Sequence, residues 1–266
     1  MSAAPRRRWR GPADLEDMLG NMPGSMGFAT RDFALVTLAA HLSAAFPGQL
    51  VFKGGLVLRH VHGNLRFSKD VDATRDQPAK QRFDAKDVAE AISAATIPNI
   101  AHFHAGTPGT DSVDSLDFNK VRVTSELFPE TGVQVEVSYR EGVVGEPVPS
   151  KIGAPFYEPF EILTMQAGEM AAEKLRTLAQ RHRSTDLADL AVLLSNLADD
   201  ERIAEYALVK FERVKQGRAN RIERIEQTIE GLAGTYDDEV PLLFPDTPSY
   251  LDAKAIVIPR IRPIVP

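Results

Sequence analysis

Alternation of apolar and polar residues is clearest between Gly132 and Arg140. Three valines occupy one parity of this stretch, and the other parity holds the polar side chains of Gln134, Glu136, Ser138 and Arg140. Since successive side chains of a strand point to opposite faces, the pattern predicts a half-buried strand that presents Glu136 to a polar site. The stretch from Asp117 to Thr124 is expected to pair with it as a hairpin.

A second alternating stretch surrounds two aspartates. Leu65, Phe67 and Val71 share one parity, whereas the other parity is polar and comprises Arg66, Ser68, Asp70 and Asp72. In an extended segment both carboxylates therefore face the same way, with their roots about 6.5–7 Å apart. This spacing lets both converge on a hard cation that prefers oxygen ligands.

The segment before these aspartates predicts a phosphate-binding turn. Leu50 to Phe52 is typical of a short buried strand, and Gly54-Gly55 follows as a tight turn in which backbone N–H groups can approach an anion. Leu56 to Val61 predicts the start of a helix, whose N-terminus favours negative charge. We therefore expect the phosphates of a nucleotide to bind at the two glycines.

Helices are expected in two parts of the chain. The first part contains a helix capped by Thr30 and a second helix from Asp84 to Ala95. From about residue 159 to residue 232 the pattern is helical, beginning with a helix from Phe160 to Ala179 and resuming near Asp186. A proline-rich segment follows, which we expect to be an ordered wrap or a partner contact rather than a free tail.

These elements predict an α+β fold, in which a mixed sheet with flanking helices precedes a C-terminal helical lobe. The expected boundaries are residues 1–155 for the α/β lobe, 156–236 for the helical lobe and 237–266 for the proline-rich segment. With 266 residues and 43% hydrophobic content, the chain can bury a substantial core in two lobes or two small domains.

Composition and charge narrow the class of protein. The chain has no Cys, which removes disulfides and cysteine zinc sites and fits a reducing cytoplasm. No apolar run approaches the length of a membrane span, so an unexported cytoplasmic protein without a membrane partner is expected. A net charge of −6 argues against a general nucleic-acid coat, because nonspecific affinity comes mainly from Lys and Arg.

Local basic patches are compatible with this acidic balance. Residues 210–224 carry six basic and two acidic side chains, and Arg176, Arg181 and Arg183 add to the helical half. Two interpretations of the 210–224 stretch stay open: a path for an RNA acceptor, and a solvated helix face with ordinary intrahelical ion pairs.

The carboxylates of Asp70, Asp72 and Glu136 are sufficient to bracket two Mg²⁺ ions. In two-metal nucleotidyl transfer one ion lowers the pKa of the attacking hydroxyl and the other neutralises the leaving pyrophosphate, with the ions about 3.5–4 Å apart. The carboxylates must then come from more than one strand, as predicted here. An Asp-x-Asp pair alone is more typical of a surface turn, so the hypothesis depends on its combination with Gly54-Gly55 and Glu136.

Three separated motifs occur in an order that resembles the AbiEii/AbiGii toxin family. They are Phe52-Lys53-Gly54-Gly55, then Arg66-Phe67-Ser68-Lys69-Asp70-Val71-Asp72, and finally Glu173-Lys174-Leu175 with Arg181 to Leu190. The resemblance covers roughly Leu50 to Leu194 and implies a nucleotidyltransferase fold. Members of this family are toxins of bacterial toxin–antitoxin and phage-abortive systems, and its MenT branch transfers nucleotides onto the 3′ end of tRNA.

The resemblance implies roles for individual residues. At the nucleotide it places Gly54, Gly55, Ser68 and Lys174. Lys53, beside the two glycines, and Arg181, which is seven residues from Lys174 on the same predicted helix face, are also expected to bind the nucleotide. As catalytic groups it implies Asp70, Asp72, Glu136, Lys174 and Asp186, the first three of which also bind metal. Asp186 has two other readings, as a group that orients a basic side chain and as a cap for the helix that follows it. The family commonly has Thr or Ser after the two glycines, where this chain has Leu56, so backbone N–H groups and Ser68 are left to contact phosphate.

The expected activity is therefore Mg²⁺-dependent transfer of NMP from an NTP to the 3′ end of RNA, foremost tRNA, which would block translation and growth. A cognate antitoxin is the implied partner, and in this class it often acts on expression without binding the toxin. Two alternatives remain at this stage. One is a protein nucleotidyltransferase or kinase, and the other is a non-catalytic nucleotide-binding or antitoxin-binding module.

Overall fold

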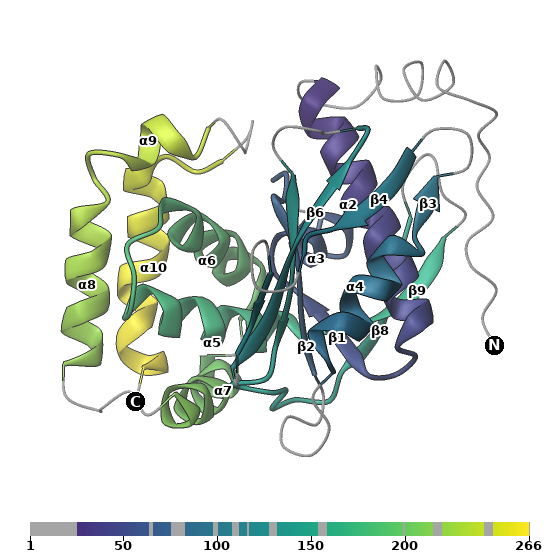
Figure 1. Cartoon of the computed structure of the whole chain (residues 1–266). Helices are drawn as coiled ribbons and strands as arrows, with labels where there is room; N and C mark the ends of the chain where they lie inside the picture. The colour runs from purple at the N-terminus through teal and green to yellow at the C-terminus, as the bar shows by residue number, and fades with distance from the viewer. Residues whose placement is uncertain are drawn as a thin grey trace. The chain divides into compact units, whose positions relative to one another are not determined.

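A computed structural model describes residues 26–63, 66–75, 83–97, 101–107, 112–115, 117–127, 132–153, 159–198, 200–214, 220–241 and 247–265. These residues divide into two compact units, and Figure 1 labels most of their elements. The first unit comprises the described residues of Met1–Gly63, Phe67–Val143 and Pro147–Thr164. The second comprises those of Asn64–Arg66, Val144–Glu146 and Met165–Pro266. The chain therefore crosses from one unit to the other more than once.

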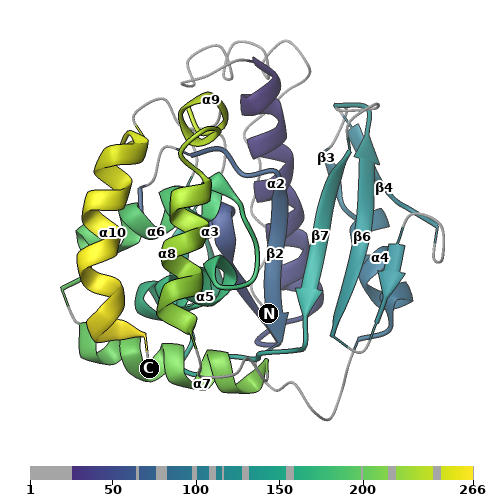
Figure 2. The same ribbon diagram turned by 90° about the vertical axis from the view of Figure 1, so that its left-hand side faces the viewer.

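The first unit is built on a mixed nine-stranded sheet with the strand order β3-β4-β6-β7-β2-β1-β9-β8, in which β5 also pairs with β6. The strand bounds are β1 Leu50–Lys53, β2 Asp70–Arg75, β3 Thr96–Ile97, β4 Ala101–Ala105, β5 Ser112–Asp114, β6 Phe118–Ser125, β7 Val133–Ser138, β8 Val148–Ile152 and β9 Phe160–Thr164. Figure 2 shows β2, β7 and β6 side by side.

The predicted hairpin is confirmed. β6 and β7 pair antiparallel from Phe118 opposite Ser138 to Val123 opposite Val133. The valines of β7 are fully or almost fully buried, and its polar residues are half-buried on the other face. Alternation over six residues was thus enough to specify both the strand and the face that carries Glu136.

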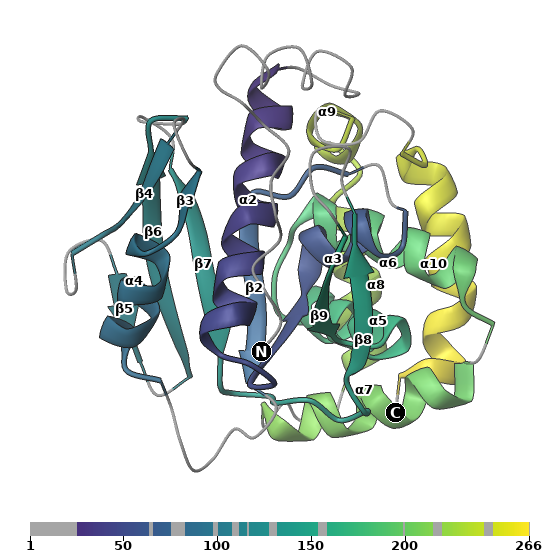
Figure 3. The same cartoon turned by 90° about the vertical axis from the view of Figure 1, so that its right-hand side faces the viewer.

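Three helices pack against strands of this unit: α2 Met26–Ala45, α3 Gly54–His60 and α4 Ala85–Ser93. α2 and α4 contact each other and cover one face of the sheet (Figure 3). The predicted cap at Thr30 is wrong, because the helix already begins at Met26. Phe28 stacks on Phe67 and Ala29 is fully buried, so the apolar surface of the helix extends one turn further towards its N-terminus.

The predicted helix from Phe160 to Ala179 is wrong in its first part. Phe160–Thr164 forms β9, which pairs antiparallel with β8 and also meets β1 in parallel, with Thr164 in register with Phe52. Five residues are too short to distinguish the two periodicities, and the strand partners are distant in sequence. The helix of this region begins at Ala167.

The second unit is helical. Its elements are α5 Ala167–Leu178, α6 Ser184–Asn196, α7 Asp200–Arg213, α8 Arg221–Gly231, α9 Tyr236–Glu239 and α10 Tyr250–Ile264. A sheet followed by a helical part makes the chain an α+β protein, as predicted. The core of this unit is formed by apolar side chains from successive helices, including Leu175, Leu187, Leu190, Phe211, Ile229 and Val257.

The proline-rich end of the chain is largely helical. Pro259 and Pro263 lie inside α10, where each lacks the N–H that would bond to the preceding turn. The helix compensates by burying one stripe of side chains against the other helices of the unit, comprising Tyr250, Ala253, Val257, Ile261 and Ile264.

A buried ion-pair cluster joins α5 to α7. Lys210 is fully buried, and its Nζ lies 2.6 Å from Glu169 and 2.9 Å from Glu173. The Glu169 carboxylate also accepts hydrogen bonds of 2.9 Å from the backbone N–H groups of Val144 and Gly145. The short segment Val144–Glu146 is thereby fixed to the helical unit.

Candidate active site

Four charged side chains occupy register positions in one row across four strands of the sheet. Lys53 of β1 lies opposite Asp72 of β2, and Asp72 lies beside Glu136 of β7. Glu136 in turn lies opposite Lys120 of β6. Register partners share a face of the sheet and adjacent strands are about 4.7–4.9 Å apart, so this charged row has two carboxylates in the middle and one ammonium group at each end.

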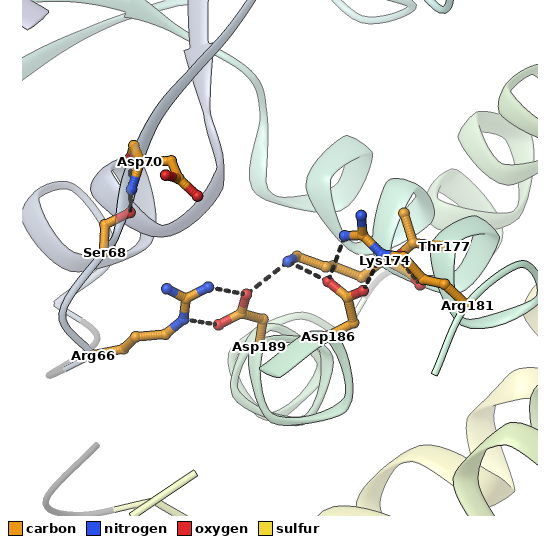
Figure 4. A network of polar contacts seen from close by, with 8 residues as sticks. All are labelled: Arg66, Ser68, Asp70, Lys174, Thr177, Arg181, Asp186 and Asp189. Carbon is orange, nitrogen blue, oxygen red and sulfur yellow. Dashed lines mark hydrogen bonds and ion pairs between the residues drawn. The ribbon is translucent and has the colours of Figure 1, made fainter. Parts of the chain in front are cut away.

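Asp70 adds a third carboxylate to the same face. It precedes Asp72 by two residues on β2 and is in register with Gln134. The strand begins at Asp70 rather than near Leu65, and the Ser68 hydroxyl holds its first residue. Ser68 Oγ donates a 2.8 Å hydrogen bond to the Asp70 carbonyl and lies 3.4 Å from the Asp70 nitrogen (Figure 4). In this structure the Ser68 hydroxyl thus orients the backbone of a carboxylate residue.

Gly54 makes room for the Asp72 carboxylate. It has a φ of +71°, a conformation that residues with a Cβ rarely adopt. A Cβ at this position would lie 2.4 Å from Asp72 Oδ2, far inside van der Waals contact. The predicted Gly-Gly turn is in fact the first turn of α3, and its first glycine is required for two separate reasons. Gly54 therefore shapes the site of the Asp72 carboxylate as well as the start of α3.

The far end of the charged row is partly open to solvent. Lys120 Nζ lies 3.6 Å from Glu136 Oε2, and the two side chains are 35% and 36% exposed. An ion pair with this exposure contributes little to stability, because solvent screens it. Glu136 is thus accessible to a ligand.

The helical unit contains a separate ionic cluster, which consists of Arg66, Lys174, Arg181, Asp186 and Asp189. Lys174 Nζ lies 2.8 Å from Asp186 and 2.7 Å from Asp189. Arg181 binds Asp186 through two nitrogens at 2.8 and 3.2 Å, and Arg66 binds Asp189 in the same way at 2.9 and 3.2 Å (Figure 4). Two carboxylates therefore hold three cationic groups.

The electrostatics of this cluster fix the charge of its central pair. Burial alone would lower the pKa of Lys174, but the Asp186 and Asp189 carboxylates more than offset it and raise the pKa above its usual range. Burial would likewise raise the pKa of Asp186, but Lys174 and Arg181 hold that pKa well below its usual range. Lys174 and Asp186 are consequently both charged at neutral pH.

The predicted site residues fall into two groups. The first unit contains Lys53, Gly54, Gly55, Ser68, Asp70, Asp72 and Glu136, and the second contains Lys174, Arg181 and Asp186. Asp186 lies in the first turn of α6 after an N-cap at Arg183, so it orients basic side chains rather than capping a helix at Leu187.

The sequence-based prediction missed two members of the ionic cluster, Arg66 and Asp189. Asp189 is fully buried, and it binds both Arg66 and Lys174. Its spacing of three residues from Asp186 places both carboxylates on one face of a helix, which is a signal that the sequence contains. Arg66 offers no comparable signal, because its partner is distant in sequence.

The carboxylates of Asp70, Asp72 and Glu136 are the groups that were predicted to bind Mg²⁺ on this face of the sheet. Among the residues that the structure describes, no three His, Cys, Asp or Glu side chains are gathered closely enough to form a metal site by themselves. Protein sites for Mg²⁺ usually supply one or two carboxylates and leave the other positions to water and substrate phosphates. Asp70, Asp72 and Glu136, which were predicted to bind metal together, do not form such a three-ligand group; the two aspartates of β2 have the oxygen chemistry of a site completed by substrate, with Glu136 on the adjacent strand.

Solved structures of other proteins share the fold of this chain. MenT4, a nucleotidyltransferase toxin from Mycobacterium tuberculosis, has 20% identity and a TM-score of 0.66, with 95% of this chain and 88% of that chain covered. JHP933 from Helicobacter pylori has 18% identity and a TM-score of 0.54, with 91% and 93% covered. A putative nucleotidyltransferase from H. pylori has 17% identity and a TM-score of 0.55, with 90% and 95% covered.

The model of the family described as "Nucleotidyl transferase AbiEii toxin, Type IV TA system" matches residues 37–256. The chain belongs to this family and is a nucleotidyltransferase toxin, and its type IV system implies an antitoxin partner. A search of curated proteins finds no match. None of the helices in the described part of the chain is long and apolar enough to cross a membrane.

Proposed function

We propose that this toxin transfers NMP from an NTP to the 3′ end of RNA, with tRNA as the acceptor, in a Mg²⁺-dependent reaction. The observation that carries the proposal is the arrangement of Asp70, Asp72 and Glu136 on two adjacent parallel strands. Gly54, which has no Cβ, leaves the space that the Asp72 carboxylate occupies. The resemblance to the MenT branch supports RNA as the acceptor. Action on tRNA would stop translation and would place the protein in the cytoplasm.

In this proposal the triphosphate lies beside Lys53 and the backbone of Gly54 and Gly55. Asp70 and Asp72 would hold Mg²⁺, which when bound neutralises phosphate charge and lowers the pKa of an attacking hydroxyl. The acceptor's 3′ oxygen forms a bond to the α-phosphorus, and the bond from that phosphorus to the α–β bridging oxygen breaks. Pyrophosphate leaves with that oxygen, and the hydroxyl proton passes to the Glu136 carboxylate.

The roles of Lys174, Arg181 and Asp186 in binding the nucleotide stay predictions. Their mutual ion pairs explain how two cationic side chains are held in a partly buried cluster, since a buried charge requires a partner. Substitution of Lys174 by Met tests the predicted role, with binding of the nucleotide as the readout.

The test of the proposed function is transfer of label to RNA. Purified protein is incubated with total RNA, Mg²⁺ and each α-³²P-labelled NTP separately. We expect label on tRNA-sized RNA with the wild-type protein and none with Asp70→Ala, because a carboxylate that holds Mg²⁺ is lost. The exposed aspartate of α4 provides a matched control, and Asp87→Ala should retain transfer. Equal thermal unfolding midpoints of the variants show that the fold is intact.

Two results would contradict the proposed function. Transfer that survives Asp70→Ala would remove the carboxylate assignment. Label on protein with none on RNA would favour the protein acceptor, and comparison of α-labelled with γ-labelled ATP would then separate nucleotidylation from phosphorylation. A thermal shift with NTP but no labelled product would favour a non-catalytic nucleotide-binding module.

A further inference from the structure

The two ends of the charged row differ in their surroundings. Lys53 directly precedes Gly54 and Gly55, where the triphosphate is proposed to bind. Lys120 lies at the other end, three strand spacings and roughly 14 Å away at the backbone. The carboxylates of Asp72 and Glu136 lie between the two lysines. The two ends of the charged row therefore differ in function: the Lys53 end is proposed to bind phosphate, and the Lys120 end has no role assigned so far.

We propose that Lys120 and Arg122 of β6 bind the backbone of the acceptor RNA next to its reacting 3′ end. This inference rests on the proposed function. In an in-line transfer the attacking and leaving oxygens lie on opposite sides of the phosphorus. If pyrophosphate departs at the Lys53 end of the row, the acceptor hydroxyl must arrive from the β6 end. The bond changes are those of the proposed reaction, and the two cationic residues position the strand that carries the hydroxyl.

The side chains of β6 are suited to this role. Lys120 and Arg122 are two residues apart on one strand, so both project from the face that carries Glu136, with roots about 6.5–7 Å apart. Arg122 is exposed and its side chain lies against Gly132, where a Cβ would come within 3.1 Å of Arg122 Nε. The glycine thus gives this guanidinium space at the start of β7.

An exposed apolar side chain extends the same row. Val113 of β5 lies opposite Lys120 in register and is 50% exposed, as one of three large hydrophobic side chains exposed among the described residues. A nucleotide presents an apolar face beside an anionic backbone. Lys120 on β6 and Val113 on the neighbouring strand β5 together offer a cationic and an apolar side chain, which matches that combination.

The ion pair between Lys120 and Glu136 is compatible with exchange of partners. Both side chains are about one-third exposed, so the ammonium group can turn from the carboxylate to a phosphate with little loss. The same movement frees Glu136 for the acceptor hydroxyl. Arrival of the acceptor and release of the carboxylate are therefore linked.

The experiment compares RNA and nucleotide affinity in Lys120→Gln, Arg122→Gln and the double variant. Lys86→Gln is the matched control, because Lys86 of α4 is 73% exposed and pairs with a glutamate on its own helix. The readouts are the KM for total tRNA in label transfer, anisotropy of 5′-fluorescein-labelled total tRNA on an Asp70→Asn background, and NTP-induced thermal shift. Lys120→Arg should restore the RNA affinity that Lys120→Gln loses.

We expect each single variant to raise the KM for tRNA roughly tenfold and the double variant roughly a hundredfold, since each lost contact is a hydrogen bond to a charged group. The slope of log affinity against log salt should flatten by about 0.7 for each lost phosphate contact to a single strand. The NTP concentration for half-maximal thermal shift should match that of Lys86→Gln.

Three results would overturn the inference. The first is an unchanged KM for tRNA in the double variant while the wild type labels RNA, which leaves the proposed function intact. The second is an equal loss of NTP and RNA affinity, which would place the two side chains at the nucleotide. The third is label on protein alone by the wild type, which would remove the proposed function and this inference together.

Discussion

Gly54 combines a backbone requirement with a requirement of the site. Its positive φ excludes most residues, and the Asp72 carboxylate occupies the space that a Cβ would fill. In contrast, Gly63 has a similar φ of +68°, but among the described residues, its chain neighbours apart, no atom lies within 4 Å of the position of a Cβ. Substitution at the two glycines therefore distinguishes the free-energy cost of the backbone conformation from the cost of displacing a carboxylate.

Gly54→Ala should remove nucleotidyl transfer and destabilise the protein by more than Gly63→Ala. The left-handed conformation alone costs about 1–2 kcal/mol for a residue with a Cβ, and both variants share that cost. Displacement of Asp72 affects Gly54→Ala alone. Urea unfolding and label transfer measure the two effects, and equal losses of activity in the two variants would contradict this account.

The Asp186 carboxylate should contribute stability that depends on pH. Its folded-state pKa lies below the ordinary value of 3.8, so the contribution is present above that value and is lost as pH falls towards the folded-state pKa. We expect Asp186→Asn to lower the free energy of unfolding by about 3 kcal/mol at pH 7, as for a broken buried ion pair. Urea titrations from pH 7 to pH 3 should show the difference from wild type shrinking below about pH 5.

Glu90→Gln is the control for this titration, because Glu90 is 67% exposed in a surface pair with Lys86. Its difference from wild type should be small throughout the same range, since solvent screens the pair. A difference for Asp186→Asn that grows on acidification would show that the carboxylate does not act through its depressed pKa.

At the scale of elements, the sequence predicted those parts of the fold whose partners are close or whose pattern is long. β7 was predictable from six alternating residues, and its hairpin with β6 followed from proximity in sequence. β9 could not be predicted in this way. Five residues are too few to distinguish the repeat of a strand from that of a helix, and its neighbour β1 is distant in sequence. The alternation of side chains along each strand was enough to predict that the carboxylates share a face. Their alignment in one row with Lys53 and Lys120 depends on the order of the strands in the sheet, which the alternation does not specify.

The pairing of α5 with α7 depends on a lysine that no solvent reaches. Lys210→Met should lower the free energy of unfolding by about 3–5 kcal/mol, because it leaves two carboxylates facing each other without their cation. Urea unfolding measures this, and adding Glu173→Gln should recover part of the loss by removing one negative charge.

Lys254→Met provides the matched substitution in an exposed pair with Glu230, and it should change the free energy of unfolding little. Equal effects of the two lysine substitutions would indicate that burial of Lys210 does not determine its contribution. A loss in Lys210→Met that Glu173→Gln deepens would contradict the role of the carboxylate pair.

At the scale of the whole molecule, the two units are not consecutive stretches of chain. The helical unit includes Arg66, which binds Asp189, and Val144 and Gly145, which donate backbone hydrogen bonds to Glu169. The sequence-based boundaries, at residues 155 and 236, assumed consecutive lobes. Contacts made by a few isolated residues have no pattern from which they could be predicted.

A fragment of residues 165–266 should therefore be less stable than the same helices in the full chain. It retains the Asp189 and Glu169 carboxylates but lacks Arg66 and the two backbone donors, and a buried polar group without its partner costs about 1–3 kcal/mol, or more when charged. Far-ultraviolet circular dichroism during urea unfolding should show a lower midpoint for the fragment. A midpoint equal to that of the full chain would contradict the contribution of the isolated segments.

The interrupted path of the chain also bears on how such a toxin can diversify. Recombination that exchanged the helical part at one breakpoint would bring in a new Glu169 and Asp189 while leaving their partners behind in the old gene segment. A functional hybrid would need a cation at position 66 to match Asp189, whereas the backbone N–H groups at positions 144 and 145 are supplied by any residue except proline. Exchange of the helical part at one breakpoint is thus constrained by the ion pair between Arg66 and Asp189.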